Sequence, residues 1–245
     1  MPSGLYIGKT SLGDVVRLTA IIDRRINPTD LLKLYEGGVR ILEFRIDSFP
    51  EDNETVFSYI KSVRSERLLR ERFGFLGTIR ETDRNRSDRV RLFEHLLPLV
   101  DCVDIEYETT IRKDVIALAR QYGKKVMIST HYFEKTPDNS ELNTIYTESM
   151  ELGADIVKLA TLARNRDDLF RLMDFTRVRS RERSNIIAIS MGSIGLVSRV
   201  IASLYGSVMT YGFIYESNAP GQLSVQDLHR ELLLYNPDYR QSLGM

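Results

Sequence analysis

The stretch ELNTIYTESMELGADIVKLAT, residues 141–161, decides the fold of this chain. Over residues 141–153 apolar side chains recur at spacings of three and four, as in an amphipathic helix, and Gly153 stands where that helix should end. The apolar run DIVKLAT (155–161) then has the length and composition of a buried strand. A helix that leads into a buried strand is the repeating unit of parallel α/β sheets.

The same alternation of amphipathic and apolar segments extends along the whole chain. Capping side chains open the first and last helices at Asn27-Pro28 and at Ser224. Glycines stand shortly before strand candidates, at Gly37, Gly123, Gly153 and Gly206. The eight strand candidates are residues 15–22, 41–47, 74–80, 102–108, 125–131, 155–161, 185–191 and 207–213. We therefore predict an α/β fold, a (β/α)8 TIM barrel that forms a single domain over residues 1–245. An open doubly wound sheet is the alternative, but no G-x-G-x-x-G follows the first strand.

Composition limits the function classes. The 34 basic and 34 acidic residues cancel, which gives no general reason for nucleic-acid or membrane binding. One cysteine and three histidines offer neither a disulfide nor a zinc-type cluster, so we expect no metal. Residues 1–14 lack the features of a signal peptide and no apolar run reaches about 18 residues, so we expect a cytoplasmic protein.

The arginine-rich stretch from Lys61 to Arg91 could be taken for a nucleic-acid patch. Acidic residues interrupt it throughout, and a strand candidate lies in its middle. Solvated helix faces of mixed charge are the better interpretation.

Charged residues occupy strand positions that a barrel core would fill with apolar ones. In ILEFRID (41–47), Glu43, Arg45 and Asp47 share one face, and Leu42, Phe44 and Ile46 share the other. We expect the apolar face to pack beneath helices and the charged face to point to the barrel axis. A purely structural ion-pair network would have the same pattern.

Six further strands, or the segments directly after them, place polar groups toward the same rim or interior. These groups are Arg80, Glu106, His131, Lys158, Arg199 and Gln222. The carboxyl ends of the strands carry the active site in (β/α)8 barrels, so this convergence predicts a site there.

Lys158 is the residue on which the chemistry depends. It could lie near a strand end and extend its amine to solvent, or it could be a nucleophile that is neutral at working pH. Proximity to Arg45 or Arg80 would disfavour its ammonium form, and the amine could then form an imine with a ketone. His131 can transfer protons near neutral pH, and an arginine can bind a carboxylate. This combination of a lysine, a histidine and arginines therefore favours imine chemistry on a small anionic keto acid.

Six segments together resemble the type I 3-dehydroquinate dehydratase family: EFRIDSF (43–49), GTIRET (77–82), ISTHYFEKTP (128–137), GADIVKLAT (153–161), MGSIGLVSR (191–199) and NAPGQLS (218–224). The resemblance implies a (β/α)8 barrel, often a homodimer, that converts 3-dehydroquinate to 3-dehydroshikimate in the shikimate pathway. It implies no metal and no dissociable cofactor.

The resemblance also implies roles for individual residues. Lys158 would form the Schiff base with the substrate ketone, and His131 would be the general acid and base. Arg199 would hold the substrate carboxylate. The remaining residues matching binding positions are Glu43, Arg45, Arg80, Asn218 and Gln222, the last two in a lid.

Three positions depart from the family pattern. Arg84 stands where some members have a glutamate that supports the histidine, Tyr132 follows His131 in place of an acidic or amide residue, and Asn218 replaces a common serine. Glu81, Asp83 or Glu106 could orient His131 instead.

Two alternatives to this function are a class I aldolase-like lyase and a non-catalytic metabolite-binding relative. The first would also use Lys158, but it does not account for HYFEKTP or APGQ. The second would be expected to lack the nucleophile or the acid–base residue, and both are present.

Overall fold

The computed structural model describes residues 4–182, 185–217 and 219–244. Within these residues, eight parallel strands form one sheet in the order β10-β3-β4-β5-β6-β7-β8-β9. The strands are β3 (Arg17–Ile22), β4 (Val39–Arg45), β5 (Gly74–Thr78), β6 (Cys102–Glu106), β7 (Lys125–Tyr132), β8 (Ile156–Leu162), β9 (Ile186–Met191) and β10 (Met209–Gly212). All eight strand candidates are therefore confirmed, with differences of a few residues at their ends.

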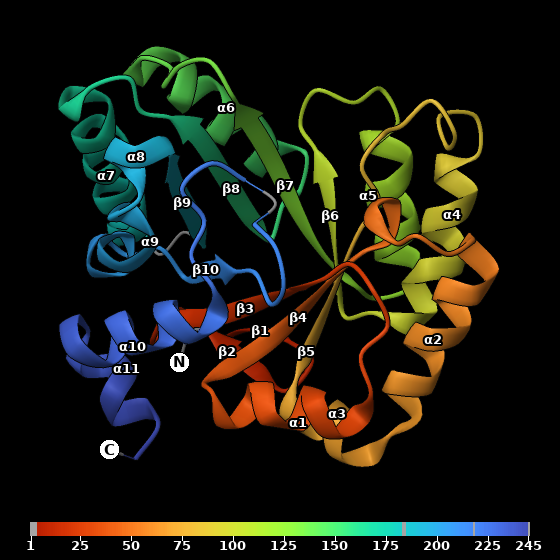
Figure 1. Ribbon diagram of the computed structural model, residues 1–245. Coiled ribbons are helices and arrows are strands. Elements are labelled where there is room, and N and C mark those ends of the chain that lie inside the picture. Colours follow the sequence, from red (N-terminus) through yellow and green to blue (C-terminus); the bar gives the residue numbers. More distant parts are fainter. Residues whose placement is uncertain (1–3, 183–184, 218, 245) are drawn as a thin grey trace.

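The sheet curves into a barrel with helices around it (Figure 1). The helices are α1 (Pro28–Glu36), α2 (Asn53–Ser65), α3 (Arg67–Arg72), α4 (Arg89–Leu96), α5 (Arg112–Gln121), α6 (Asn139–Glu151), α7 (Arg166–Arg181), α8 (Gly192–Gly195), α9 (Ser198–Ile201), α10 (Val225–Tyr235) and α11 (Pro237–Ser242). Three short 3-10 helices are η1 (Ile46–Ser48), η2 (Leu97–Leu99) and η3 (Ala202–Tyr205). The two strands at the ends of this order, β10 and β9, approach each other where they begin and so close the barrel. There the Val208 N–H, just before β10, donates to the carbonyl of Ile186 in β9 at 3.0 Å. The (β/α)8 prediction is confirmed.

Helix ends follow the sequence signals. The Asn27 side chain accepts a hydrogen bond from the Asp30 N–H at 2.9 Å, and Pro28 occupies the first turn of α1. Ser224 caps α10 in the same way, accepting from the Asp227 N–H at 3.0 Å. Gly206 has φ +98°, and a Cβ there would lie 2.2 Å from the Ser180 side chain, so the position requires glycine.

Two separate apolar clusters lie on the two faces of the sheet. The outer cluster, between strands and helices, includes Leu42, Phe44 and Ile46, as predicted for strand 41–47. The inner cluster fills the barrel, with Ile41, Leu76, Met127 and Ile156 among its members. Apolar side chains therefore fill the interior near the strand beginnings, which leaves the strand ends for polar groups.

A short antiparallel hairpin, absent from the sequence prediction, closes the barrel at its N-terminal end. It consists of β1 (Leu5–Ile7) and β2 (Thr10–Leu12). Ile7 and Leu12 join the inner cluster, and a Cβ on Gly74 at the start of β5 would lie 2.4 Å from the Ile7 carbonyl oxygen. Strands of three residues carry too little periodicity to be recognised from sequence.

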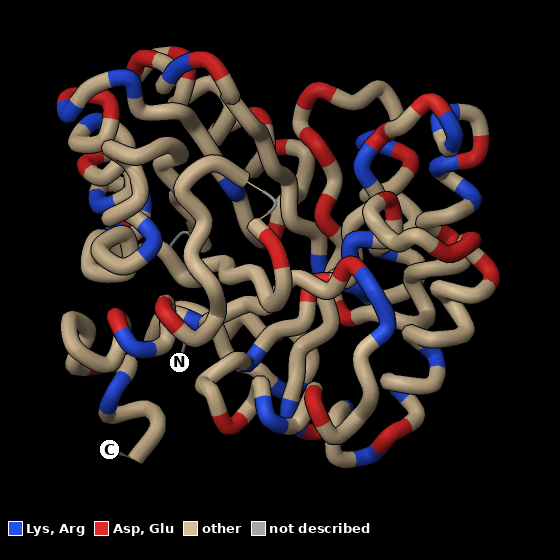
Figure 2. Tube along the Cα trace, in the orientation of Figure 1, with Lys and Arg blue, Asp and Glu red and all other residues tan. Residues whose placement is uncertain are grey.

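Basic and acidic residues are interspersed over the outer helices (Figure 2). In the arginine-rich stretch, Arg67 pairs with Glu71 and Arg86 with Glu81, each at 2.8 Å. The first pair lies on α3 and the second in the loop between β5 and α4, so the stretch has surfaces of mixed charge, as predicted. In the part of the chain described, no helix is long and apolar enough to cross a membrane.

Candidate active site

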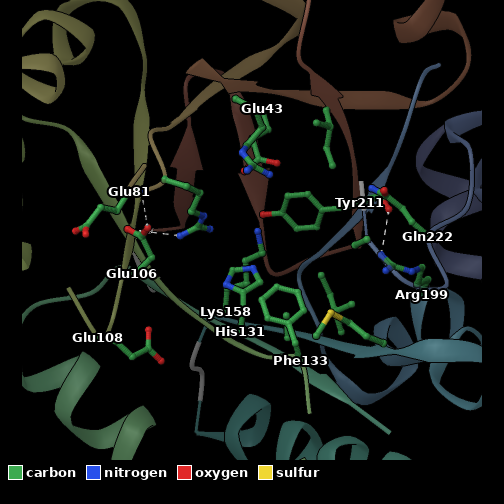
Figure 3. Close-up of a pocket in the computed structure, with 17 residues that line it drawn as sticks. Glu43, Glu81, Glu106, Glu108, His131, Phe133, Lys158, Arg199, Tyr211 and Gln222 are labelled. Atoms are coloured by element: carbon green, nitrogen blue, oxygen red, sulfur yellow. Dashed lines mark hydrogen bonds and ion pairs between the residues drawn. The ribbon is translucent and has the colours of Figure 1, made fainter. Parts of the chain in front are cut away.

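One cavity of about 400 Å³ opens at the carboxyl ends of the strands (Figure 3). Every sequence-predicted site residue that the structure describes lines it: Glu43, Arg45, Arg80, His131, Lys158, Arg199 and Gln222. Asn218, the remaining one, lies outside the described residues. The predicted convergence on one rim is therefore confirmed for these seven side chains.

Lys158 lies in the middle of β8 and points into the barrel, with 5% of its surface exposed. Its Nζ is 3.4 Å from Asp104 Oδ2 and 4.1 Å from the centroid of the Tyr211 ring. The amine does not extend to solvent along a strand end. Lys158 therefore has a carboxylate and an aromatic ring beside its nitrogen, neither of which the sequence interpretation included.

Asp104 is fully buried on β6, two strands from Lys158 in the sheet. It accepts hydrogen bonds from Ser129 Oγ at 2.5 Å and from Arg80 Nη2 at 3.0 Å. Burial alone would raise the pKa of this carboxyl, but Arg80, Lys158 and the Ser129 hydroxyl outweigh it and hold the pKa well below its usual range. Asp104 is therefore a permanent anion.

His131 lies near the end of β7, the strand next to Lys158. Burial, together with the cationic Arg80 and Lys158, holds the pKa of its imidazole well below the usual value. Its ring stacks on Phe133 with 6.1 Å between centroids. At neutral pH this imidazole is uncharged and can accept a proton.

None of the three carboxylates suggested for orienting His131 bonds to its ring in the described part of the chain. Glu106 pairs with Arg89 and Arg80, and Glu81 with Arg86. Asp83 is 96% exposed at its side chain and pairs with Arg86 at 3.3 Å. The arginines of this region already hold these acids, so that expectation from the sequence is not met.

The charged side chains of strand β4, Glu43 and Arg45, line the cavity, as the alternation of residues predicted. Glu43 is buried, and its Oε1 accepts from the Thr78 hydroxyl at 2.7 Å. Arg45 donates to both oxygens of Asp47, at 3.2 and 2.8 Å. These neighbours fix both side chains in position before a ligand arrives.

Arg199, at the start of α9, is a buried cation that pairs with no carboxylate in the described parts of the chain. It is 3% exposed, and its Nε donates to the Gly221 carbonyl at 2.6 Å. Its Nη2 has no hydrogen-bond partner among the described residues. Burial lowers the pKa of Arg199 to about 10. A guanidinium held in this way favours an anionic ligand.

Comparison with known proteins identifies the family to which the chain belongs. Residues 22–237 match the family model described as Type I 3-dehydroquinase. The chain belongs to the type I 3-dehydroquinase family. It is 40% identical to the 3-dehydroquinate dehydratase of Methanococcoides burtonii over 209 residues, 80% of this chain and 85% of that one. It is 36% identical to that of Hydrogenobaculum sp. over 208 residues, 81% of this chain and 90% of that one.

Solved structures agree with the type I 3-dehydroquinase assignment. The 3-dehydroquinate dehydratase from Geobacillus kaustophilus superposes with a TM-score of 0.82 at 25% identity, covering 96% of this chain and 98% of that one. The type I enzyme from Clostridium difficile, solved with covalent modified comenic acid, gives 0.80 at 26% identity with the same coverage.

Several polar residues of this type I 3-dehydroquinase site escaped sequence analysis, Asp104 and Ser129 among them. Asp104 stands two residues before Glu106, and Ser129 two residues before His131, so each lies on the same strand face as a predicted residue. That alternation is the signal that could have found them. Among the described residues, no cluster of three or more histidine, cysteine or acidic side chains could hold a metal ion.

Proposed function

We propose that this chain dehydrates 3-dehydroquinate to 3-dehydroshikimate through an imine on Lys158, a reaction of the shikimate pathway. Family membership and the 3-dehydroquinate dehydratases among its relatives support the reaction. The observation that carries the proposal is one cavity that combines a buried amine, an uncharged imidazole and a guanidinium for which residues 4–182, 185–217 and 219–244 supply no counter-ion.

Substrate binding depends on charge complementarity. Arg199 takes the substrate carboxylate, because its Nη2 lacks a hydrogen-bond partner in the described structure. Each of the other cations that line the cavity, Arg45, Arg80 and Lys158, pairs with a carboxylate. Arg45 and Arg80 are held by Asp47 and Asp104, so they present fixed donors to substrate hydroxyls. Glu43 has one oxygen engaged by Thr78, and the other would accept from a hydroxyl. Gln222 lies in the loop after β10, from which it would cover the bound substrate.

The chemistry begins when Lys158 attacks the substrate ketone as a free amine. Loss of water gives an iminium, which acidifies the proton on the adjacent carbon because it can accept that electron pair. His131 takes this proton and returns it to the hydroxyl that leaves as water. Hydrolysis of the imine then releases the conjugated product. Lys158 and His131 come from the neighbouring strands β8 and β7 and both line the cavity (Figure 3), which supports these roles.

Borohydride reduction during turnover tests the imine directly. We expect 3-dehydroquinate to develop the absorbance of a conjugated enone, and mass spectrometry after reduction to place a covalent adduct on Lys158. Lys125 is 41% exposed at its side chain and serves as an internal control that should remain unmodified. Turnover without an adduct on Lys158 would contradict the mechanism.

The same experiment distinguishes the alternatives. An aldolase-like lyase would give no enone from 3-dehydroquinate, although Lys158 could still form adducts with another ketone. A metabolite-binding relative would bind 3-dehydroquinate without turnover or adduct.

A further inference from the structure

We propose that Asp104 is a positioning residue that holds the Lys158 nitrogen in its cationic form both before and after the imine forms. This inference rests on the proposed function and adds a residue to it. Asp104 does not line the cavity, and its side chain is fully buried. Its Oδ2 lies 3.4 Å from the reactive nitrogen, so Asp104 acts on the substrate through Lys158.

The carboxylate of Asp104 is fixed in orientation. Oδ1 accepts from Ser129 Oγ at 2.5 Å, and Oδ2 accepts from Arg80 Nη2 at 3.0 Å. Arg80 Nη1 also donates to Ser129 Oγ at 3.0 Å, which closes the three side chains into one network. Oδ2, the oxygen that faces Lys158, therefore has a fixed position that does not depend on the lysine.

Charge balance explains why a permanent anion suits this position. The ammonium of Lys158 first transfers a proton to neutral His131, and the free amine attacks the carbonyl carbon. A C–N bond forms while the carbonyl π bond breaks, and the nitrogen gives a second proton to the alkoxide oxygen that results. The carbinolamine formed in this way loses its hydroxyl as water with the proton returned by His131. The nitrogen lone pair completes the C=N bond. The nitrogen thus carries one positive charge at the start and one at the end, and the same carboxylate stabilises both.

Asp104 itself does not accept the proton. Burial opposes its ionisation, but Arg80, Lys158 and Ser129 prevail and hold its pKa well below the usual range, so it remains a carboxylate throughout. The proton acceptor is His131, whose pKa is lowered by burial and by the cations Arg80 and Lys158. Asp104 therefore remains a negative charge beside Lys158, and His131 accepts and returns the proton.

The variant Asp104→Asn tests the effect of the Asp104 carboxylate on the Lys158 nitrogen, and the test needs no substrate. Asparagine has the same shape but no charge. Cyanate is small enough to enter the cavity and reacts with neutral amines. We expect site-resolved mass spectrometry to show Lys158 carbamylated at least about tenfold faster at pH 7.5 in the variant, equivalent to about 1.36 kcal/mol. The excess should shrink toward about pH 11, where lysine amines are largely neutral. A loosened structure would instead raise labelling at every pH.

Catalysis gives the second measurement. With 3-dehydroquinate, Asp104→Asn should lower kcat at least about tenfold and reduce the fraction of borohydride-trapped adduct, with KM changed less than threefold because no substrate contact is removed. Glu106→Gln is the matched control. It removes a carboxylate from the next inward position of β6 that pairs with Arg80 but has no contact with Lys158, so Lys158 labelling should stay at the wild-type rate.

The outcomes are distinguishable. Equal Lys158 labelling in wild type and Asp104→Asn overturns the inference. If Asp104→Asn does not fold, Ser129→Ala removes one anchor of the carboxylate and should raise labelling about threefold, and an unchanged rate overturns the inference. If the wild type neither turns over nor traps 3-dehydroquinate, the proposed function fails, while the labelling comparison still decides whether Asp104 controls the lysine.

Discussion

Replacing Arg199 by methionine should stabilise the unliganded protein while it removes most of the activity. The side chain is 3% exposed and has no carboxylate partner in the described structure. At about 1.36 kcal/mol per pKa unit, a fall from 12.5 to about 10 means that the charged guanidinium is less stable here than in water. The difference is about 3 kcal/mol.

The net effect on stability is smaller than this penalty. Arg199→Met also removes the hydrogen bond to the Gly221 carbonyl, which contributes about 1–2 kcal/mol. We therefore expect a gain of about 1–2 kcal/mol in the free energy of unfolding at pH 7. Since a domain of this size shifts by about 2–4 °C per kcal/mol, Tm should rise by a few degrees in a calorimetric scan without ligand.

The effect on activity should have the opposite sign. Two charge-assisted hydrogen bonds to the substrate carboxylate are worth about 3–5 kcal/mol, so kcat/KM should fall roughly 10²- to 10⁴-fold in an enone absorbance assay. Substrate analogues that carry the carboxylate should no longer raise the Tm of the variant.

Arg89→Met is the matched control. Arg89 is also buried, at 1% exposure, but it pairs with Glu106 and donates to the Ile79 carbonyl at 2.8 Å. Its loss removes the nearer of the two arginines that pair with the Glu106 carboxylate and should cost about 3 kcal/mol of stability. If Arg199→Met were destabilised as much as Arg89→Met, with kcat/KM within tenfold of wild type, Arg199 would be part of the scaffold and the reasoning would be refuted.

Further predictions concern the amine and the imidazole. Lys158→Met should give no borohydride adduct and lower kcat by at least about 10³-fold, because no other amine replaces the nucleophile; an adduct elsewhere with normal turnover would exclude the imine role. The acid limb of kcat/KM should lie below about pH 6.5, since burial, Arg80 and Lys158 keep His131 uncharged. In Arg80→Gln that limb should move upward toward 6.5, and an unchanged limb would show that Arg80 does not control the imidazole. Because unfolded histidine takes up a proton near pH 6.5 while His131 does not, wild-type stability should fall below that pH by up to about 1.36 kcal/mol per pH unit. His131→Asn should lack this part of the decline in urea unfolding at pH 5 and 8, and equal slopes for the two proteins would contradict the depressed pKa.

Much of the barrel could be predicted because its signals are local. Each strand candidate stands out by its apolar run, and each helix by its spacing and its terminal glycine or cap, as in the stretch from Glu141 to Thr161. The alternation of Glu43 and Arg45 with Leu42 and Phe44 gave the correct inward face, because side chains two apart on a strand must point the same way. The hairpin of β1 and β2 was missed because three-residue strands carry no such period.

The environment of Lys158 could not be predicted in the same way. Sequence analysis placed arginines near it and expected them to disfavour its ammonium form. The structure adds a carboxylate, Asp104, at 3.4 Å and the Tyr211 ring at 4.1 Å from the Lys158 nitrogen. Asp104 and Lys158 are 54 residues apart, and nothing in either local segment specifies the contact.

The sequence by itself determined the eightfold alternation, the face of each strand that turns inward and the reactive groups that gather at one rim. These follow from backbone geometry and from the cost of exposing apolar surface, which act over a few residues at a time. Only the tertiary structure decided which charges meet. It pairs Lys158 with Asp104 and leaves Arg199 without a carboxylate among the described residues, because ion pairing depends on separations of a few ångströms between strands and loops distant in the chain.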